Sequence, residues 1–262
     1  MPRFAANLTF LWTDRPFVSR FDAAARAGFA AVEYMFPYAE DLDAIAAELR
    51  RLKLRQTLFN LPAGDWAAGD RGIAVAPGRR EEFREGVRVG IQVAQFLHCP
   101  RVNCLVGKQL EDVPLKEQWA CLVDNIKMAA AAFEQVGLVL LVEPINTIDM
   151  PGFFLRTPSE AFQLQEAVGA ANLKVQYDVY HAQRMEGNLT HTITRNIGRI
   201  GHIQIADAPD RNQPGTGEIH YPYLLRAIDR TDYAGDVGLE YRPTGATDES
   251  FDWIEEMGFS RG

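Results

Sequence analysis

Short apolar runs alternate with longer stretches of helical periodicity along the whole sequence, and this alternation constrains the fold more than any other feature. Several runs are rich in β-branched residues and apolar on both faces, as buried parallel strands are. The eight runs lie at residues 3–7, 31–34, 55–59, 101–105, 138–143, 173–178, 202–205 and 237–241. Their character predicts a parallel sheet that is covered on both faces.

The stretches between these runs carry apolar residues at helical spacing and end at helix-stop signals. Residues 17–27 precede Gly28, and residues 41–52 begin at Asp41, a good N-terminal capping residue. The other predicted helices are 79–97, 114–136, 159–168, 189–200, 222–228 and 249–257. Strand and helix alternating eight times predict one (β/α)8 TIM barrel domain, α/β in class, over residues 1–262. A doubly wound open sheet is the alternative, but the sequence lacks its usual Gly-rich phosphate-binding turn after an early strand.

Composition and charge argue against several classes of protein. The chain has 27 Lys and Arg against 35 Asp and Glu, and this net charge of −8 disfavours a nucleic-acid backbone as partner. No apolar run approaches the roughly 18 residues that span a bilayer, so we expect no membrane partner, and no signal-peptide core opens the chain. Cys99, Cys104 and Cys121 form no C-x-x-C pair, so we expect a reduced, cytoplasmic location.

Polar side chains close the last four apolar runs. Glu143, Asp178 and Glu240 end three of them, and Gln204 lies near the end of the fourth. Functional side chains of a TIM barrel lie at the C-terminal ends of its strands, so we expect these four to converge. Three converging carboxylates repel one another unless a cation lies between them. Oxygen ligands suit Mg²⁺ or Mn²⁺, so the four residues predict a divalent metal site, without choosing between the two ions.

Three further residues are candidate substrate contacts. His181 lies three residues past Asp178, in the predicted loop after the sixth strand, where it could donate to a substrate oxygen or be held by local hydrogen bonds. Lys108 and Arg211 follow the fourth and seventh strands and compete for a substrate carboxylate, although Lys108 could equally be a solvated surface residue. The loops at residues 61–78 and 206–217 are long, and we expect them to cover the site.

Five longer motifs carry a family resemblance. They are residues 60–69 (NLPAGDWAAG), 103–108 (NCLVGK), 143–146 (EPIN), 176–181 (QYDVYH) and 214–219 (PGTGEI). Together they resemble the hydroxypyruvate isomerase family, which belongs to the xylose isomerase-like TIM barrels, and the similarity covers nearly the whole chain. The resemblance implies conversion of hydroxypyruvate to tartronate semialdehyde and a metal bound by Glu143, Asp178, Gln204 and Glu240. It further implies that Glu143 and Glu240 act as proton donor and acceptor, and that the chain forms a dimer or tetramer.

Several alternatives stay open at this point. The reaction moves a carbonyl between adjacent carbons, and two glutamates favour proton transfer through an enediolate over a metal-mediated hydride shift. A 2-oxo-tetronate isomerase, or more remotely a ketose 3-epimerase, would use the same residues. A DNA-repair endonuclease of this superfamily needs a histidine-rich zinc cluster and a basic surface, whereas the chain has five histidines and a negative charge. A binding protein without catalysis would have no reason to keep all four presumed ligands.

Overall fold

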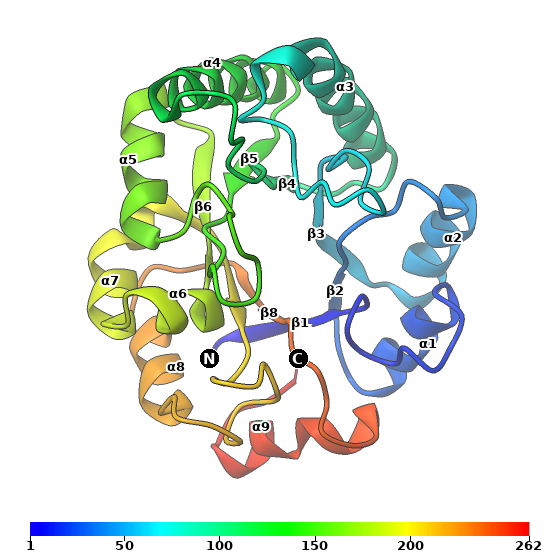
Figure 1. Ribbon diagram of the computed structural model, residues 1–262. Coiled ribbons are helices and arrows are strands. Elements are labelled where there is room, and N and C mark those ends of the chain that lie inside the picture. Colours follow the sequence, from blue (N-terminus) through cyan, green and yellow to red (C-terminus); the bar gives the residue numbers. More distant parts are fainter. Residues whose placement is uncertain (262) are drawn as a thin grey trace.

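A closed barrel of eight parallel strands forms the centre of the computed structural model, which describes residues 1–261 (Figure 1). The strands are β1 (Arg3–Asn7), β2 (Ala31–Glu33), β3 (Arg55–Asn60), β4 (Arg101–Cys104), β5 (Val139–Val142), β6 (Leu173–Asp178), β7 (Ile200–Ile205) and β8 (Asp236–Leu239). The predicted (β/α)8 TIM barrel is therefore confirmed. The last residue of the predicted domain, Gly262, lies outside the described residues.

Helices surround the barrel on its outer side (Figure 1). In the described chain they are α1 (Ser19–Arg26), α2 (Leu42–Leu52), α3 (Arg80–Phe96), α4 (Leu115–Glu134), α5 (Pro158–Val168), α6 (Val179–Met185), α7 (Leu189–Asn196), α8 (Tyr221–Asp229) and α9 (Asp252–Glu256). Short 3₁₀ turns η1 (Pro77–Arg79), η2 (Ile197–Arg199) and η3 (Thr247–Phe251) precede α3, β7 and α9. Each helix buries one face; α2, for example, buries Ile45, Ala46 and Leu49.

Strand pairing brings polar residues to the same height at one end of the barrel. The pairing of β1 with β8 closes the ring. In the β6–β7 pair Asp178 lies opposite Gln204, and in the β3–β4 pair Asn60 lies opposite Asn103. Because alternate residues of a strand point to the same face, the inward side chains at the C-terminal ends form one polar layer above the apolar core.

Most predicted elements match the structure within a few residues, with one clear omission. Asp41 caps α2 as expected, because its side chain accepts a hydrogen bond from the backbone N–H of Ala44 at 3.0 Å. Helix α6, however, was predicted as a loop. It starts directly after β6 and has seven residues, so it is too short to show helical periodicity. His181 therefore lies in the first turn of a helix and not in a loop.

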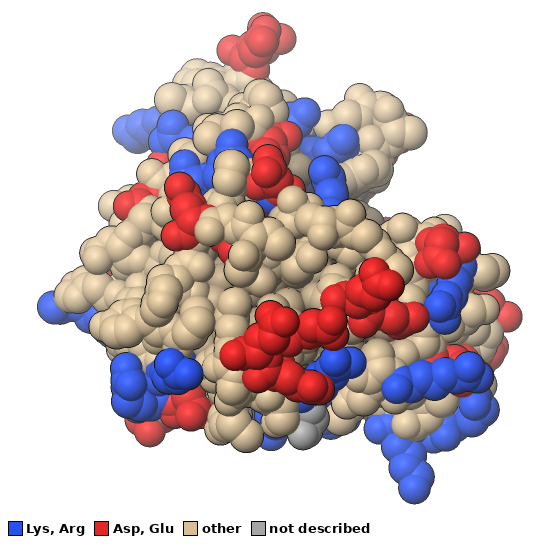
Figure 2. Space-filling view, turned by 90° about the horizontal axis from the view of Figure 1, so that it is seen from below, with Lys and Arg blue, Asp and Glu red and all other residues tan. Residues whose placement is uncertain are grey.

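The outer surface agrees with the charge of the sequence. On the face shown in Figure 2, a group of acidic side chains crosses the middle and basic side chains lie in separate groups around it. Such a mixed face offers no continuous basic track for a phosphate backbone. Among the helices of residues 1–261, none has both the length and the apolar character needed to cross a membrane.

Candidate active site

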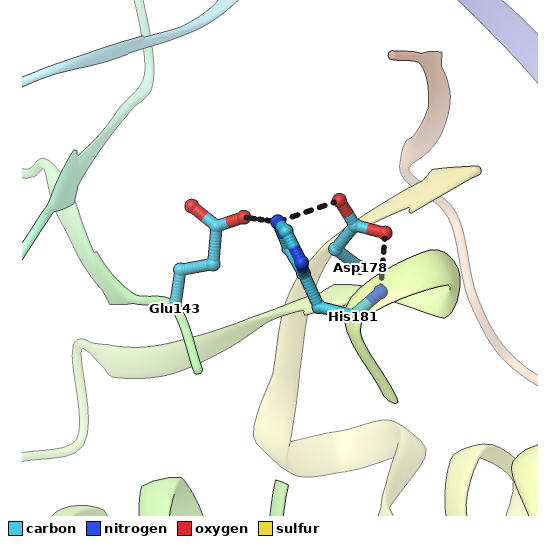
Figure 3. A group of neighbouring side chains, drawn as sticks. All are labelled: Glu143, Asp178 and His181. Carbon is cyan, nitrogen blue, oxygen red and sulfur yellow. Dashed lines mark hydrogen bonds and ion pairs between the residues drawn. The ribbon is translucent and has the colours of Figure 1, made fainter. Parts of the chain in front are cut away.

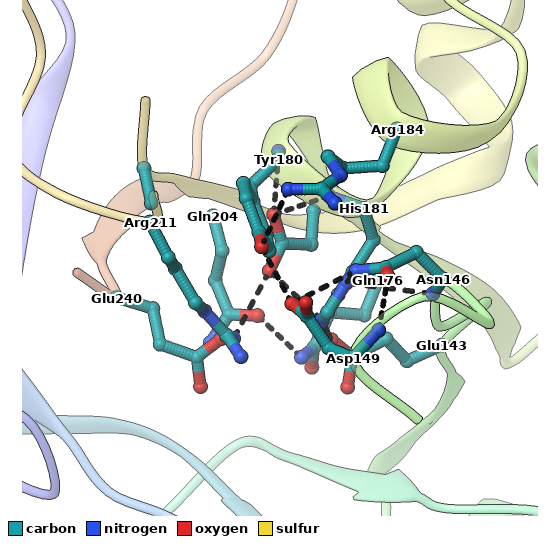
Figure 4. Close-up of polar contacts among 12 residues, drawn as sticks. Glu143, Asn146, Asp149, Gln176, Tyr180, His181, Arg184, Gln204, Arg211 and Glu240 are labelled. Atoms are coloured by element: carbon teal, nitrogen blue, oxygen red, sulfur yellow. Dashed lines mark hydrogen bonds and ion pairs between the residues drawn. The ribbon is translucent and has the colours of Figure 1, made fainter. Parts of the chain in front are cut away.

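A cavity of about 900 Å³ opens at the C-terminal end of the barrel. Glu143, His181, Arg211 and Glu240 line it, together with residues from the loops that follow β1, β2, β3 and β7. This is the end at which TIM barrel enzymes place their catalytic groups. Figure 4 shows Glu143, His181, Arg211 and Glu240 within a group of residues joined by hydrogen bonds and ion pairs.

Glu143 is the first residue after β5 and is buried. Its Oε2 accepts a hydrogen bond of 2.9 Å from Nδ2 of Asn103 on β4. Burial, reinforced by the nearby carboxylates of Glu240 and Asp178, raises the pKa of Glu143 well above its usual value. The surroundings of Glu143 therefore favour the protonated carboxyl group over the carboxylate.

The two carboxylate oxygens of Asp178, the last residue of β6, have different surroundings. Its Oδ1 caps α6 by accepting hydrogen bonds from the backbone N–H groups of Tyr180 at 2.7 Å and His181 at 3.3 Å. Its Oδ2 is buried and makes no hydrogen bond within the described chain. That oxygen lies 3.6 Å from Nε2 of His181 and 3.5 Å from Nη2 of Arg211. A buried carboxylate oxygen without a partner is expected to have a ligand.

Glu240 directly follows β8 and forms an ion pair with Arg211. Burial raises the pKa of Glu240 to about 8, although the guanidinium of Arg211 acts in the opposite direction. Arg211 comes from the loop after β7, which is organised around the carboxylate of Asp207. The Oδ2 of Asp207 accepts hydrogen bonds from the backbone N–H groups of Gly215 and Gly217, each at 2.9 Å. These bonds fold the loop back over the barrel and bring Arg211 into the cavity.

Gln204 belongs to a second, deeper network. Its Oε1 accepts a hydrogen bond of 2.6 Å from Nε2 of Gln176, and its own Nε2 donates to Oε1 of Glu33 at 2.7 Å. Glu33 ends β2, is fully buried, and also accepts from Nδ2 of Asn7 at 2.9 Å. Its other oxygen lies 2.6 Å from Nε2 of His202. Because a carboxylate only accepts, Glu33 fixes the amide nitrogen of Gln204 toward itself.

His181 stands between Glu143 and Asp178 (Figure 3). Its Nδ1 lies 2.6 Å from Nδ2 of Asn146, whose Oδ1 is already used by the backbone N–H groups of Ile148 and Asp149. Asn146 therefore donates to Nδ1, and the hydrogen-bond pattern assigns the proton of neutral His181 to Nε2. Burial lowers the pKa of His181 to about 4, so the imidazole is neutral at pH 7. It presents a neutral N–H donor to the cavity.

The donor set of this site fits a divalent cation. Ligand oxygens of Glu143 and Asp178 lie within 4.8 Å of each other, and both residues are buried. With Glu240, the site holds three carboxylates, and the guanidinium of Arg211 contacts two of them. This excess of negative charge, and the unpartnered Oδ2 of Asp178, are what a bound cation would compensate.

The structure brings only one of the two predicted carboxylate-binding cations to the cavity. Arg211 lies within the site, but Lys108 does not line the cavity. The loop at 61–78 contributes Trp66 and Arg71 to the cavity wall, and the loop at 206–217 contributes Pro209 and Asp210 besides Arg211.

Sequence reasoning missed Glu33, His202 as its partner, and Arg71. Glu33 is a charged residue inside the apolar run at 31–34, and this signal could have identified it.

Comparison with known proteins places the chain in a family. The model of the family described as xylose isomerase-like TIM barrel matches residues 21–257. Hydroxypyruvate isomerase of Escherichia coli K12 is 49% identical over 97% of this chain and 99% of its own length. A 2-oxo-tetronate isomerase of Cupriavidus necator H16 is 42% identical over 97% of this chain and 98% of its own. A crystal structure described as AP endonuclease, family 2 from Brucella melitensis superposes with a TM-score of 0.95 at 43% identity, covering 98% of this chain and 99% of that one.

The chain therefore belongs to the xylose isomerase-like TIM barrel family. Within that family it is a hydroxypyruvate isomerase-like enzyme, since its full-length relatives include proteins named as isomerases. The resemblance inferred from the motifs at 60–69 and 176–181 is thereby confirmed.

Proposed function

We propose that this protein interconverts hydroxypyruvate and tartronate semialdehyde by moving a proton between adjacent carbons. One observation carries the proposal: Glu143 and Glu240 line a single cavity from β5 and β8, and burial raises the pKa of both. A carboxyl group whose pKa lies near the working pH can take a proton and return it. The names of two full-length relatives, hydroxypyruvate isomerase and 2-oxo-tetronate isomerase, support the same class of substrate.

The proton path follows from this pair. One glutamate removes a proton from the carbon that carries the hydroxyl group, and the released electron pair forms an enediolate as negative charge moves onto the carbonyl oxygen. The other glutamate returns a proton to the neighbouring carbon. The hydroxyl proton moves from one substrate oxygen to the other, so that the ketone becomes a hydroxyl group and the hydroxyl carbon becomes an aldehyde. Each proton lost is regained, and the product is an isomer of the substrate.

In this proposal His181 stabilises the enediolate. Its Nε2 carries the proton and lies 3.9 Å from Oε1 of Glu143 and 3.6 Å from Oδ2 of Asp178. A neutral imidazole N–H directed at a developing oxyanion stabilises it without adding a charge to the ground state. With the proton on Nε2, this nitrogen acts as a donor and leaves metal coordination to the oxygen ligands.

A divalent ion, Mg²⁺ or Mn²⁺, completes the proposal. Its ligands would be Glu143, Asp178, Gln204 and Glu240, and it would supply Lewis-acid stabilisation of negative charge on the substrate oxygens. Asp178 and Gln204 are register neighbours at the ends of β6 and β7, which supports their acting together. Arg211 balances part of the remaining charge through its contacts with Glu240 and Asp178.

A second candidate is isomerisation of a four-carbon 2-oxo-tetronate. The cavity volume of about 900 Å³ supports it, because a three-carbon acid fills only a small part of that space. A ketose 3-epimerase is a more remote candidate, since a neutral sugar gives no use for the cavity's free cationic side chains.

A substrate panel tests the proposal. The purified protein is incubated with Mg²⁺ or Mn²⁺ and hydroxypyruvate, a four-carbon 2-oxo-tetronate, or neutral ketoses, and products are followed by NMR. We expect turnover of an acid, reduced by about 10²- to 10⁴-fold in Glu143→Gln. Equal turnover of neutral ketoses would contradict the assignment to acids.

A further inference from the structure

We propose that Arg71, on the loop after β3, binds the carboxylate of the substrate. The inference rests on the proposed function, because it assigns a role within the same cavity. Arg71 is half-buried and lines that cavity beside Trp66. Hydroxypyruvate carries a terminal carboxylate bonded to one of its two reacting carbons, and a planar guanidinium is the side chain best shaped to bind it.

The guanidinium of Arg71 is held in a fixed orientation. Its Nη1 donates to the backbone oxygens of Trp66 at 3.0 Å and Asp70 at 2.6 Å. Its central carbon lies 3.9 Å from the centre of the Trp66 ring, which packs against Phe36 with ring centres 5.2 Å apart. Two carbonyl oxygens and an aromatic face thus restrain the plane of the group.

This arrangement leaves one edge of the guanidinium free. The two hydrogens of Nη1 are used by the two carbonyl oxygens, whereas Nε and Nη2 make no hydrogen bond to residues 1–261. The Nε–Nη2 edge is one that binds a carboxylate through two parallel hydrogen bonds. Asp70, the neighbouring acid, is not available to fill it, because its Oδ2 pairs with Nη1 of Arg79 at 2.7 Å.

The other cationic side chains are less suited to this role. Arg211 already contacts two carboxylates of the site. Arg20 lines the cavity, but its Nη1 and Nε donate to the backbone oxygens of Leu8 and Arg15 at 2.7 and 3.1 Å. Arg242 is exposed, and Lys108 does not line the cavity. Arg71 alone among these combines a position in the wall with a fixed plane and a free edge.

The backbone beside Arg71 fixes its position in the barrel. Gly72 pairs with Val106 beyond the end of β4 and has a φ of +106°. A Cβ at Gly72 would lie 1.9 Å from the backbone oxygen of Leu105, so only glycine permits this approach. The loop after β3 is therefore bound to the segment after β4, and this contact fixes the position of the neighbouring Arg71 in the cavity wall.

Variants at Arg71 test the proposal through the split between KM and kcat. In Arg71→Gln we expect the KM for hydroxypyruvate to rise about 10- to 100-fold with kcat little changed, because a charged hydrogen-bonded contact made equally in both states is lost. Arg71→Lys should restore part of the affinity, since an amine keeps the charge without the two-bond geometry. Arg230→Gln removes the same charge from the exposed end of α8 and serves as the matched control.

Direct binding separates this inference from the proposed function. Tartronate, a non-reacting hydroxy diacid, is titrated calorimetrically into the metal-loaded wild-type protein, Arg71→Gln, and Lys108→Gln. We expect weaker binding only in Arg71→Gln. If wild type isomerises hydroxypyruvate and Arg71→Gln keeps the wild-type KM and tartronate affinity, the role of Arg71 is wrong while the function stands. If wild type isomerises no acid but binds tartronate more tightly than Arg71→Gln does, the function is wrong and the carboxylate site stands. If wild type does not bind tartronate, the carboxylate site is wrong, and turnover of hydroxypyruvate alone decides the function.

Discussion

The amide nitrogen of Gln204 donates a hydrogen bond of 2.7 Å to the fully buried carboxylate of Glu33. Glu33 can only accept, so the nitrogen of Gln204 faces Glu33, and its oxygen, which accepts a hydrogen bond of 2.6 Å from Gln176, is the atom that a cation would meet. A buried carboxylate at the end of β2 thus orients a proposed metal ligand at the end of β7. Residues that hydrogen-bond to a metal ligand, without touching the metal themselves, determine which atom of the ligand faces the cation.

Glu33→Gln should weaken metal binding. The new amide group would place N–H donors against Asn7, Gln204 or His202, and Gln204 could turn its own nitrogen toward the cavity. We expect the Kd for Mn²⁺ to rise about 10- to 100-fold, measured by calorimetry on the metal-free protein. Glu134→Gln, at the exposed end of α4, is the control. Unchanged affinity in Glu33→Gln would show that Gln204 needs no such support.

Two substitutions of Asp178 distinguish its role as the N-cap of α6 from the role of its negative charge in metal binding. Asn caps helices about as well as Asp, so Asp178→Asn should keep the thermal stability of the metal-free protein within about 1 kcal/mol, whereas Asp178→Ala should lose about 1 kcal/mol more. Both variants should bind Mn²⁺ far more weakly than wild type. Calorimetric unfolding and metal titration of the two proteins give the comparison. Wild-type metal affinity in Asp178→Asn would remove Asp178 from the ligand set.

Substitution of either glutamate should stop proton transfer without unfolding the barrel. Glu143→Gln and Glu240→Gln are each expected to reduce turnover by about 10²- to 10⁴-fold, the usual contribution of a positioned acid or base. In D₂O, wild-type product should carry deuterium at the carbon that receives the proton, as mass spectrometry can measure. Complete retention of the substrate hydrogen would instead identify a hydride shift.

The stability of the metal-free protein should depend on pH through Glu240. Burial raises the pKa of Glu240 in the folded state to about 8, above the 4.5 of an unfolded glutamate. The folded state therefore holds a proton that the unfolded state has lost, and this contribution to stability declines as pH rises from about 4.5 to about 8. Glu240→Gln has no such titration.

The matched measurement is the Tm of both proteins at several pH values. The Tm advantage of metal-free Glu240→Gln over wild type should grow between pH 5 and 8 and then level off. A constant difference would mean that the carboxyl group of Glu240 titrates as an ordinary exposed glutamate.

The fold and the strand-end residues could be predicted from the sequence because both depend on local pattern. Buried strands leave apolar runs, and Glu143 and Glu240 stand at the ends of two of them. The sequence of helix α6 shows no helical spacing of apolar residues. The helix begins because Asp178 caps its first turn, and not because it buries an apolar face. This is why His181 was assigned to a loop.

Long-range contacts could not be predicted from the sequence in the same way. The pairing of Arg211 with Glu240 depends on how the loop after β7 folds around Asp207. The orientation of Arg71 depends on carbonyl oxygens and on the ring of Trp66, and spacing along the chain encodes neither.

The most direct test of the account is hydroxypyruvate isomerisation by the chelator-treated protein before and after a divalent ion is returned. The protein is stripped with EDTA, dialysed, and followed by NMR with no metal, with Mg²⁺ and with Mn²⁺. The account predicts that the stripped protein keeps its fold but forms no tartronate semialdehyde, and that one of the two ions restores turnover. Full activity in the stripped protein, or none after either ion is added, would contradict it.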